Sequence, residues 1–167
     1  INETTFETHD WYQDGRTIEF YARLTDAAGN IQYGSKSSDD IVIDVTAPTI
    51  SSISIIDDGT TPHNDSVTVT FSENVYPDAT QGTANLQDSD FSVTLSGGTA
   101  TSPVIGSITK TSQSVWNFDL TYTGSADGTE TLTVNAASAA IFDAAGNAAA
   151  TTQSGTNNQE TLNDDNP

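Results

Sequence analysis

In the segment VWNFDLTY, residues Val115–Tyr122, every second side chain is large and apolar. Trp116, Phe118, Leu120 and Tyr122 share one face of an extended strand, because successive side chains of a strand point to opposite sides. The pattern predicts a β-strand with one buried face.

Similar alternation recurs along the chain, and no window shows a sustained helical period. From residue 50 onward the strand-like segments are short and are separated by turn residues. A weakly apolar stretch at 148–162 is expected to hold the last strand. The sequence therefore predicts an all-β sandwich of about seven to eight antiparallel strands. The segments that carry this pattern are Ile50–Ile56, Ser66–Ser72, Asp90–Leu95, Val104–Ile108, Val115–Tyr122 and Thr129–Val134.

The composition narrows the possible partners. Acidic residues outnumber basic ones 23 to 4, for a net charge of −19, which argues against binding of nucleic acid or anionic membranes. The acidity suits either a solvated surface in a salty or extracellular medium or the binding of a hard cation such as Ca²⁺. With no cysteine there are no disulfides, and the absence of long apolar runs predicts no membrane insertion.

The pentapeptide Asp-Ala-Ala-Gly-Asn occurs twice, at Asp26–Asn30 and at Asp143–Asn147, with an offset of 117 residues. Each copy is followed by an acidic stretch that ends in proline, 22 residues after the first Asp at Pro48 and 24 residues after the second at Pro167. This periodicity predicts one full repeat plus the end of a preceding one from a tandem array.

The boundary is placed near Pro48, because a residue that precedes proline is held extended. Residues 1–46 hold about three strands, too few for a two-layer core. In Thr17–Thr25 we expect a half-buried face made of Ile18, Phe20, Ala22 and Leu24. Residues 1–46 are thus predicted to be a partial β domain, either an incomplete repeat or strands that complete the sheet of a partner.

Three segments and the second pentapeptide carry a family resemblance. They are YARLTDAAGN (Tyr21–Asn30), DVTAPTI (Asp44–Ile50), VTFSENV (Val69–Val75) and Asp143–Asn147. Together they resemble the bacterial immunoglobulin-like tandem repeats of large cell-surface adhesins.

This resemblance implies an immunoglobulin-like (Ig-like) fold. Residues 1–46 would be the C-terminal strands of one repeat, and residues 47–167 a complete repeat with an acidic tail. It also implies a non-catalytic structural or adhesive spacer, extracellular on the bacterial surface or secreted. The partners would be neighbouring repeats and a host or matrix glycan or protein, with Ca²⁺ at the repeat junctions.

The repeated pentapeptide has a purely structural explanation. Its Asp caps backbone N–H groups, and Gly or Asn takes the left-handed conformation that a tight turn needs. The alternative is that Asp143 and Asn147 supply oxygens to Ca²⁺. In an immunoglobulin-type sandwich this turn lies near the linker that holds Asp44 and near the end of the second strand, at Glu73. The predicted ligands are Asp44, Glu73, Asp143 and Asn147, with Asp78 as a further candidate.

Other acidic groups are interpreted as solvated turns or faces, with metal binding as the alternative. They are Asp57-Asp58-Gly59 with Asn64-Asp65, Asp39-Asp40 and Asp164-Asp165.

A carbohydrate-binding module is a second hypothesis, with Trp11-Tyr12 and Tyr76 as a stacking platform and Trp116 in the core. A surface-layer or filament subunit that self-assembles through residues 1–46 is a third. No catalytic motif is recognised, so the chain is predicted not to be an enzyme.

Overall fold

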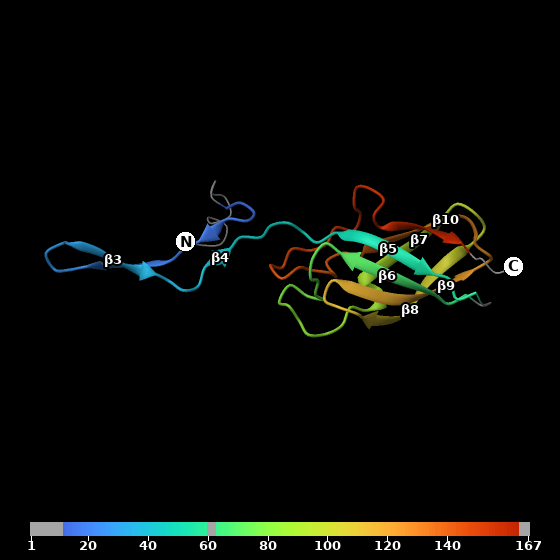
Figure 1. Ribbon diagram of the computed structural model, residues 1–167, viewed down its shortest axis with the longest axis horizontal. Coiled ribbons are helices and arrows are strands. Elements are labelled where there is room, and N and C mark those ends of the chain that lie inside the picture. The colour runs from blue at the N-terminus through green and yellow to red at the C-terminus, as the bar shows by residue number, and fades with distance from the viewer. Residues whose placement is uncertain (1–11, 60–62, 164–167) are drawn as a thin grey trace. The chain divides into compact units, whose positions relative to one another are not determined.

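A computed structural model of the protein describes residues 12–59 and 63–163. The chain divides into two compact units, Ile1–Thr46 and Ala47–Pro167. All paired strands in the described residues are antiparallel, and the helical content there is a single 3₁₀ turn, η1 (Asp88–Asp90). Figure 1 shows the strands of both units.

The first unit is built from a two-stranded ribbon. Strand β1 (Thr17–Ile18) pairs with β4 (Ile41–Val42), and β2 (Tyr21–Thr25) pairs with β3 (Ile31–Lys36) inside it. The turn Asp26–Asn30 closes the ribbon at its tip. The pairing follows from the two alternating segments and the turn-forming pentapeptide between them.

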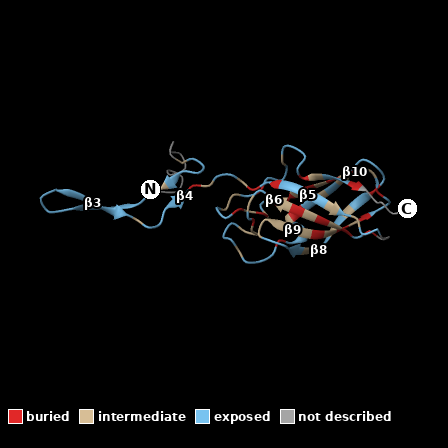
Figure 2. Cartoon of the chain, viewed as in Figure 1, coloured by how far each residue is buried: buried red, intermediate tan, exposed pale blue. Residues whose placement is uncertain are grey.

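The predicted half-buried face of this ribbon is confirmed at Ile18, which is half-buried, and is wrong at its other three positions. Phe20 and Leu24 are both exposed, and Leu24 keeps 66% of its surface in contact with solvent. Figure 2 shows β3 exposed along its length. Among residues 12–46 no second layer packs on the ribbon, so its apolar side chains stay exposed there.

The described residues of the second unit form seven strands in two sheets, as the sequence predicted. One sheet has the order β5-β6-β9-β8 and the other has the order β11-β10-β7. The strands are β5 (Ile50–Ile56), β6 (Asp65–Phe71), β7 (Phe91–Ser96), β8 (Thr101–Lys110), β9 (Val115–Thr123), β10 (Asp127–Ala136) and β11 (Gln159–Asn163).

The core lies between these two sheets. Trp116, Phe118 and Leu120 of β9 are fully buried, so the predicted inward face is confirmed. Phe91 of the opposite sheet packs on Phe118 with ring centroids 5.8 Å apart. Burial of such side chains, at about 25 cal/mol per Å² of apolar surface, supplies the main stabilisation of this unit. Figure 2 shows the alternation of buried and half-buried positions along β6 and β9.

The two ends of this sandwich are distinguished by the strands that begin and end there. The entry pole is where β5 begins and β6 ends, and there the side chain of Gln153 bonds both the N–H and the carbonyl of Ile50, each at 2.9 Å. The exit pole is where β6 begins and β9 ends, because Asp65 pairs with Leu120. Strand β11 also ends at the exit pole, where its last residue pairs with Asp127 at the start of β10.

Candidate functional site

The turn Asp143–Asn147 lies at the entry pole, and its first residue is fully buried. Asp143 Oδ1 accepts hydrogen bonds from the N–H groups of Ala145 and Asn147, both at 2.8 Å. Its Oδ2 accepts a bond of 2.7 Å from the Asn147 side-chain amide. Gly146 has a φ of +90°, in the left-handed region that glycine adopts without strain. The structural explanation of the pentapeptide therefore accounts for its Asp, Gly and Asn.

The first copy of the pentapeptide has the same bonds in an exposed setting. Asp26 Oδ1 accepts from the N–H groups of Ala28 at 2.9 Å and Asn30 at 2.8 Å. Its Oδ2 accepts from the Asn30 side-chain amide at 2.7 Å. The Asn30 side-chain and backbone donors hold the pKa of the Asp26 carboxyl below its usual value, because they stabilise the charged form.

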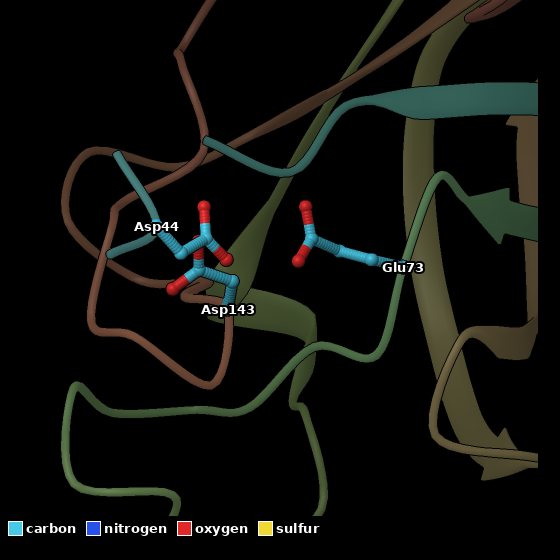
Figure 3. A group of neighbouring side chains, drawn as sticks. All are labelled: Asp44, Glu73 and Asp143. Carbon is cyan, nitrogen blue, oxygen red and sulfur yellow. The ribbon is translucent and has the colours of Figure 1, made fainter. Parts of the chain in front are cut away.

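Asp143 also belongs to a group of three carboxylates. Asp44, Glu73 and Asp143 each offer an oxygen, and these oxygens all lie within 4.8 Å of one another. Figure 3 shows the Glu73 side chain reaching from its loop toward the other two. Two ligands of one Ca²⁺ lie at most about 4.6–5.2 Å apart, because Ca–O distances are about 2.3–2.6 Å. The three oxygens are thus close enough to share one such ion.

Each of the three is placed by a strand end. Glu73 lies two residues after the end of β6, and Asp44 lies on the segment that leads into β5. Asp143 follows Phe142, whose backbone pairs with that of Tyr76. Asp44 and Glu73 are half-buried, whereas Asp143 has no exposed surface. The group therefore combines one buried carboxylate with two that solvent reaches.

The other two predicted ligands have different surroundings. Asn147 uses its side-chain amide to hold Asp143, as described above. Asp78 is turned into its own loop, where its Oδ1 accepts from the Thr80 N–H at 2.8 Å, the Thr80 hydroxyl at 2.6 Å and the Gly82 N–H at 3.1 Å. These bonds, the Thr80 hydroxyl first, lower the pKa of Asp78. Asp78 is not among the three grouped carboxylates, and its loop instead braces the turn through a 3.0 Å bond from Gln81 Nε2 to the Ala144 carbonyl.

The sequence analysis did not predict that Glu130, at the exit pole, is a buried carboxylate. Glu130 Oε1 accepts from the N–H groups of Thr99 at 2.6 Å and Ala100 at 3.0 Å, and Oε2 accepts from the Asp127 N–H at 3.0 Å. These donors, Ala100 first, lower the pKa of Glu130 to about 2 despite its burial. The signal was present, because Glu130 shares the inward face of its strand with Leu132.

The remaining candidates are placed as follows. Trp116 is buried in the core, as expected, and Tyr76 is half-buried. Asp40 forms an ion pair of 2.7 Å with Lys36. Asp65 is fully buried, so the interpretation of its cluster as a solvated turn is wrong for this residue. Trp11, Asp164 and Asp165 lie outside the described residues.

Comparison with protein families gives one match, to the model of a bacterial Ig-like domain over residues 44–157. Searches of curated proteins and of solved structures give no match. Domains of this family occur in bacterial surface proteins and are generally non-catalytic structural domains. None of the helices in the described residues has the length and apolar character that a membrane span requires. The match covers more than half of the chain, including all three grouped carboxylates, and the chain therefore belongs to the bacterial Ig-like domain family.

Proposed function

We propose that the protein is a non-catalytic spacer module of an extracellular bacterial surface protein. The observation that carries this proposal is the filled core of the Ig-like sandwich. A cavity lined by Pro48, Ile50, Phe71 and Gln153 has a volume of about 10 Å³, room for about one water molecule. A substrate site needs about 300 Å³ or more, so this module is suited to spacing and presentation rather than to chemistry.

The proposal includes a structural Ca²⁺ ion held by Asp44, Glu73 and Asp143. Three carboxylates within 4.8 Å repel one another unless a cation is shared or protons are taken up. Residues 47–167 contain fourteen acidic residues but a single basic one, Lys110. Its ammonium donates to Gln113 and lies 5.5 Å from the centre of the Trp116 ring. A cation from solution that bound all three carboxylates would offset their repulsion.

Such an ion would fix the segment that contains Asp44 to the entry pole of the Ig-like domain. Two of its ligands belong to the sandwich, whereas Asp44 lies on the segment that leads into β5. An ion bound to all three would reduce the freedom of that segment, and this would suit a stiff tandem array. Neighbouring repeats would be its first partners, with a glycan or protein of a host or matrix as the target of the whole array.

The test compares thermal unfolding of the full chain in EDTA and in Ca²⁺. We expect a higher melting temperature in Ca²⁺, because a ligand at a hundredfold excess over its Kd stabilises the folded state by about 2.7 kcal/mol. For a domain of this size, 1 kcal/mol corresponds to roughly 3–5 °C. Glu73→Gln should reduce the Ca²⁺-dependent shift, whereas Asp88→Asn, at an exposed residue outside the group, should leave it unchanged. If Ca²⁺ raised the melting temperatures of the wild type and of Glu73→Gln equally, the proposal of Ca²⁺ binding at this site would be wrong.

Self-assembly through the ribbon of the first unit is a second candidate function. Its apolar side chains are exposed in the described chain, with Leu24 and Tyr33 at 66% and 65%. A partner strand or sheet could cover them, as in strand addition. Sedimentation velocity over a range of concentrations tests this. Leu24→Asp should abolish any association, whereas Val104→Asp, at another exposed apolar position on β8, should not. A monomer at all concentrations would exclude this candidate.

A further inference from the structure

The exposed apolar side chains of the protein are concentrated in its first unit. Ten large hydrophobic side chains are exposed among the described residues, and eight of them belong to residues 12–46. The other two, Ile56 and Val104, lie on β5 and β8, which form opposite edges of one sheet, so they make no common patch. Contiguous apolar surface on a soluble protein usually marks a place where a partner binds. In the described chain, that place is the ribbon.

One face of the ribbon is charged. The Tyr21 hydroxyl donates a bond of 3.0 Å to Glu19, and Lys36, which is paired with Tyr21 in the register, bonds Glu19 at 2.8 Å. Arg23 lies opposite Tyr33 and belongs to the same side, because alternate residues of a strand point the same way. We call this side of β2 and β3 the charged face.

The opposite side, the apolar face, carries no charged side chain. It is made of Phe20, Ala22 and Leu24 on one strand and of Gln32 and Gly34 on the other. A Cβ at Gly34 would meet the Cβ of Ala22 at 3.4 Å, so these two small residues lie side by side. Phe20 and Leu24 are exposed on either side of them. The apolar face thus has a low centre between two large side chains.

The described surface of the Ig-like domain does not match this face. On the outer side of one sheet Thr68 donates a bond of 2.6 Å to Asn117, and on the outer side of the other Thr133 lies opposite Thr94. Apolar side chains that covered such groups would remove their water without giving new hydrogen bonds. The surface that fits is the apolar face of a second copy, where large side chains can pack on small ones.

The distribution of charge favours the same contact. Residues 16–36 contain three of the four basic residues and two acidic ones, for a net charge of +1. The remaining residues contain one basic and 21 acidic residues, for a net charge of −20. Two copies therefore repel each other least where their ribbons meet.

We propose that two copies of the protein bind each other through the apolar faces of their ribbons. The pairing rests on the self-assembly proposed above and adds its face and its partner. The contact is isologous, because the same side chains meet from both copies. A six-residue ribbon is roughly 20 Å long and 10 Å wide, so the two faces bury roughly 400 Å², against about 1,200 Å² for a stable complex. The dimer is weak for a single chain, and several ribbons of a tandem array would strengthen it.

A cross-linking experiment on the full chain locates the contact. The chain has no cysteine, so a single introduced cysteine is cross-linked only to that of another copy. Ala22→Cys places it on the apolar face, and the matched control Thr25→Cys places it on the charged face of the same strand. We expect a bis-maleimide reagent with a span of about 10 Å, the spacing of packed sheets, to cross-link Ala22→Cys several times faster.

Addition of Leu24→Asp to Ala22→Cys should lower the cross-linking rate to that of the control, because a charge on the apolar face opposes the contact. Both positions are exposed, so the substitutions should not disturb the ribbon. Equal rates for Ala22→Cys and Thr25→Cys, or a faster rate for Thr25→Cys, would overturn the proposal.

Salt dependence separates this contact from one between the ribbon and an acidic surface of another copy. The Debye length falls from about 10 Å at about 0.1 M salt to about 3 Å at about 1 M. We expect sedimentation velocity to show stronger association at the higher concentration, because salt screens the repulsion between chains of net charge −19. Weaker association at high salt would overturn the pairing of apolar faces but would leave self-assembly in place. A monomer under all conditions would overturn both.

Discussion

The two copies of the pentapeptide have the same sequence and the same hydrogen bonds but different surroundings. Asp26 and Asp143 each accept two backbone N–H bonds and one side-chain bond, with lengths that agree within 0.1 Å. Asp26 is exposed at the tip of a ribbon, whereas Asp143 is fully buried and lies beside Asp44 and Glu73. The local sequence thus determines the turn, and the tertiary structure determines what else the turn can do.

The difference arises from what packs against each turn. The Asp78 loop covers the second copy, and Gln81 donates to the Ala144 carbonyl. The first copy has bonds of its own but is exposed at all five positions. Burial removes water as an alternative partner, so the same three bonds contribute more at Asp143.

The largest expected difference comes from the same substitution in both turns. Asp143→Ala should destabilise the Ig-like domain by about 2–4 kcal/mol, because it removes a fully buried carboxylate that accepts three hydrogen bonds. Asp26→Ala should have a much smaller effect, because water replaces the lost bonds. Denaturant unfolding of both variants measures this. Equal losses would show that burial does not separate the two turns.

A pH titration of Glu130→Gln tests whether burial strengthens carboxylate–N–H bonds elsewhere in the domain. The variant should lose about 2 kcal/mol near neutral pH, because glutamine cannot accept from Thr99, Ala100 and Asp127 together. The pKa of Glu130 is lowered from 4.5 to about 2, so its contribution is complete above pH 4.5. It disappears as the pH falls toward 2.

The wild type and Glu130→Gln should therefore converge in stability across that range of pH. The measurement is the free energy of unfolding of both proteins at several pH values. A difference that stays constant down to pH 2 would contradict the assignment of these bonds to the charged carboxylate.

Calcium should distinguish the two turns without any substitution. We expect backbone amide resonances of Ala145 and Asn147 to shift on addition of Ca²⁺, while those of Ala28 and Asn30 stay in place. Asp26 has no grouped carboxylates around it in the described residues. Two-dimensional NMR of the full chain measures both turns at once. Equal shifts at the two turns would show that calcium acts on the pentapeptide itself and not on the group of three.

The smallest difference is expected at the glycines of the two turns. Gly29 and Gly146 have φ values of +87° and +90°, so alanine should be strained by about 1 kcal/mol at either position. An added Cβ meets nothing within 4 Å at Gly29 and makes ordinary contacts of 3.4–3.5 Å with Ala79 at Gly146. We expect the two substitutions to destabilise their turns by similar free energies. Denaturant unfolding measures this for Gly146→Ala, and amide hydrogen exchange in the first unit measures it for Gly29→Ala. A much larger loss at Gly146 would mean that packing also constrains this turn.

Much of the sandwich was predictable because alternation reports directly which face of a strand is apolar. Val115–Tyr122 placed Trp116 and Phe118 correctly for that reason. The same pattern failed for Leu24, since alternation shows which face can be buried but not whether another layer covers it. Whether a second layer covers a strand depends on distant parts of the chain, so the sequence of the strand alone does not predict it.

The acidic residues show the same limit. Asp65 and Glu130 lie on inward faces of their strands, so their burial was readable from the alternation. Their different hydrogen bonding was not readable, because the donors to Glu130 come from a separate loop at Thr99 and Ala100. Knowledge of an Ig-like topology was enough to bring Asp44, Glu73 and Asp143 together, whereas Asp78 bonds within its own loop. Metal binding itself stays a prediction.

The close approach of the Gly97-Gly98 turn to Glu130 has a consequence for the evolution of the domain. A Cβ at Gly98 would lie 1.9 Å from Glu130 Oε1 and 2.1 Å from Cδ. A larger residue at position 98 therefore requires the Glu130 side chain to shift or to be shorter, and either change weakens its bonds to the N–H groups of Thr99 and Ala100. Among related domains, positions 98 and 130 should therefore change together or not at all. They are coupled although they lie far apart in the sequence, since 31 residues separate Glu130 from Thr99, the neighbour of Gly98.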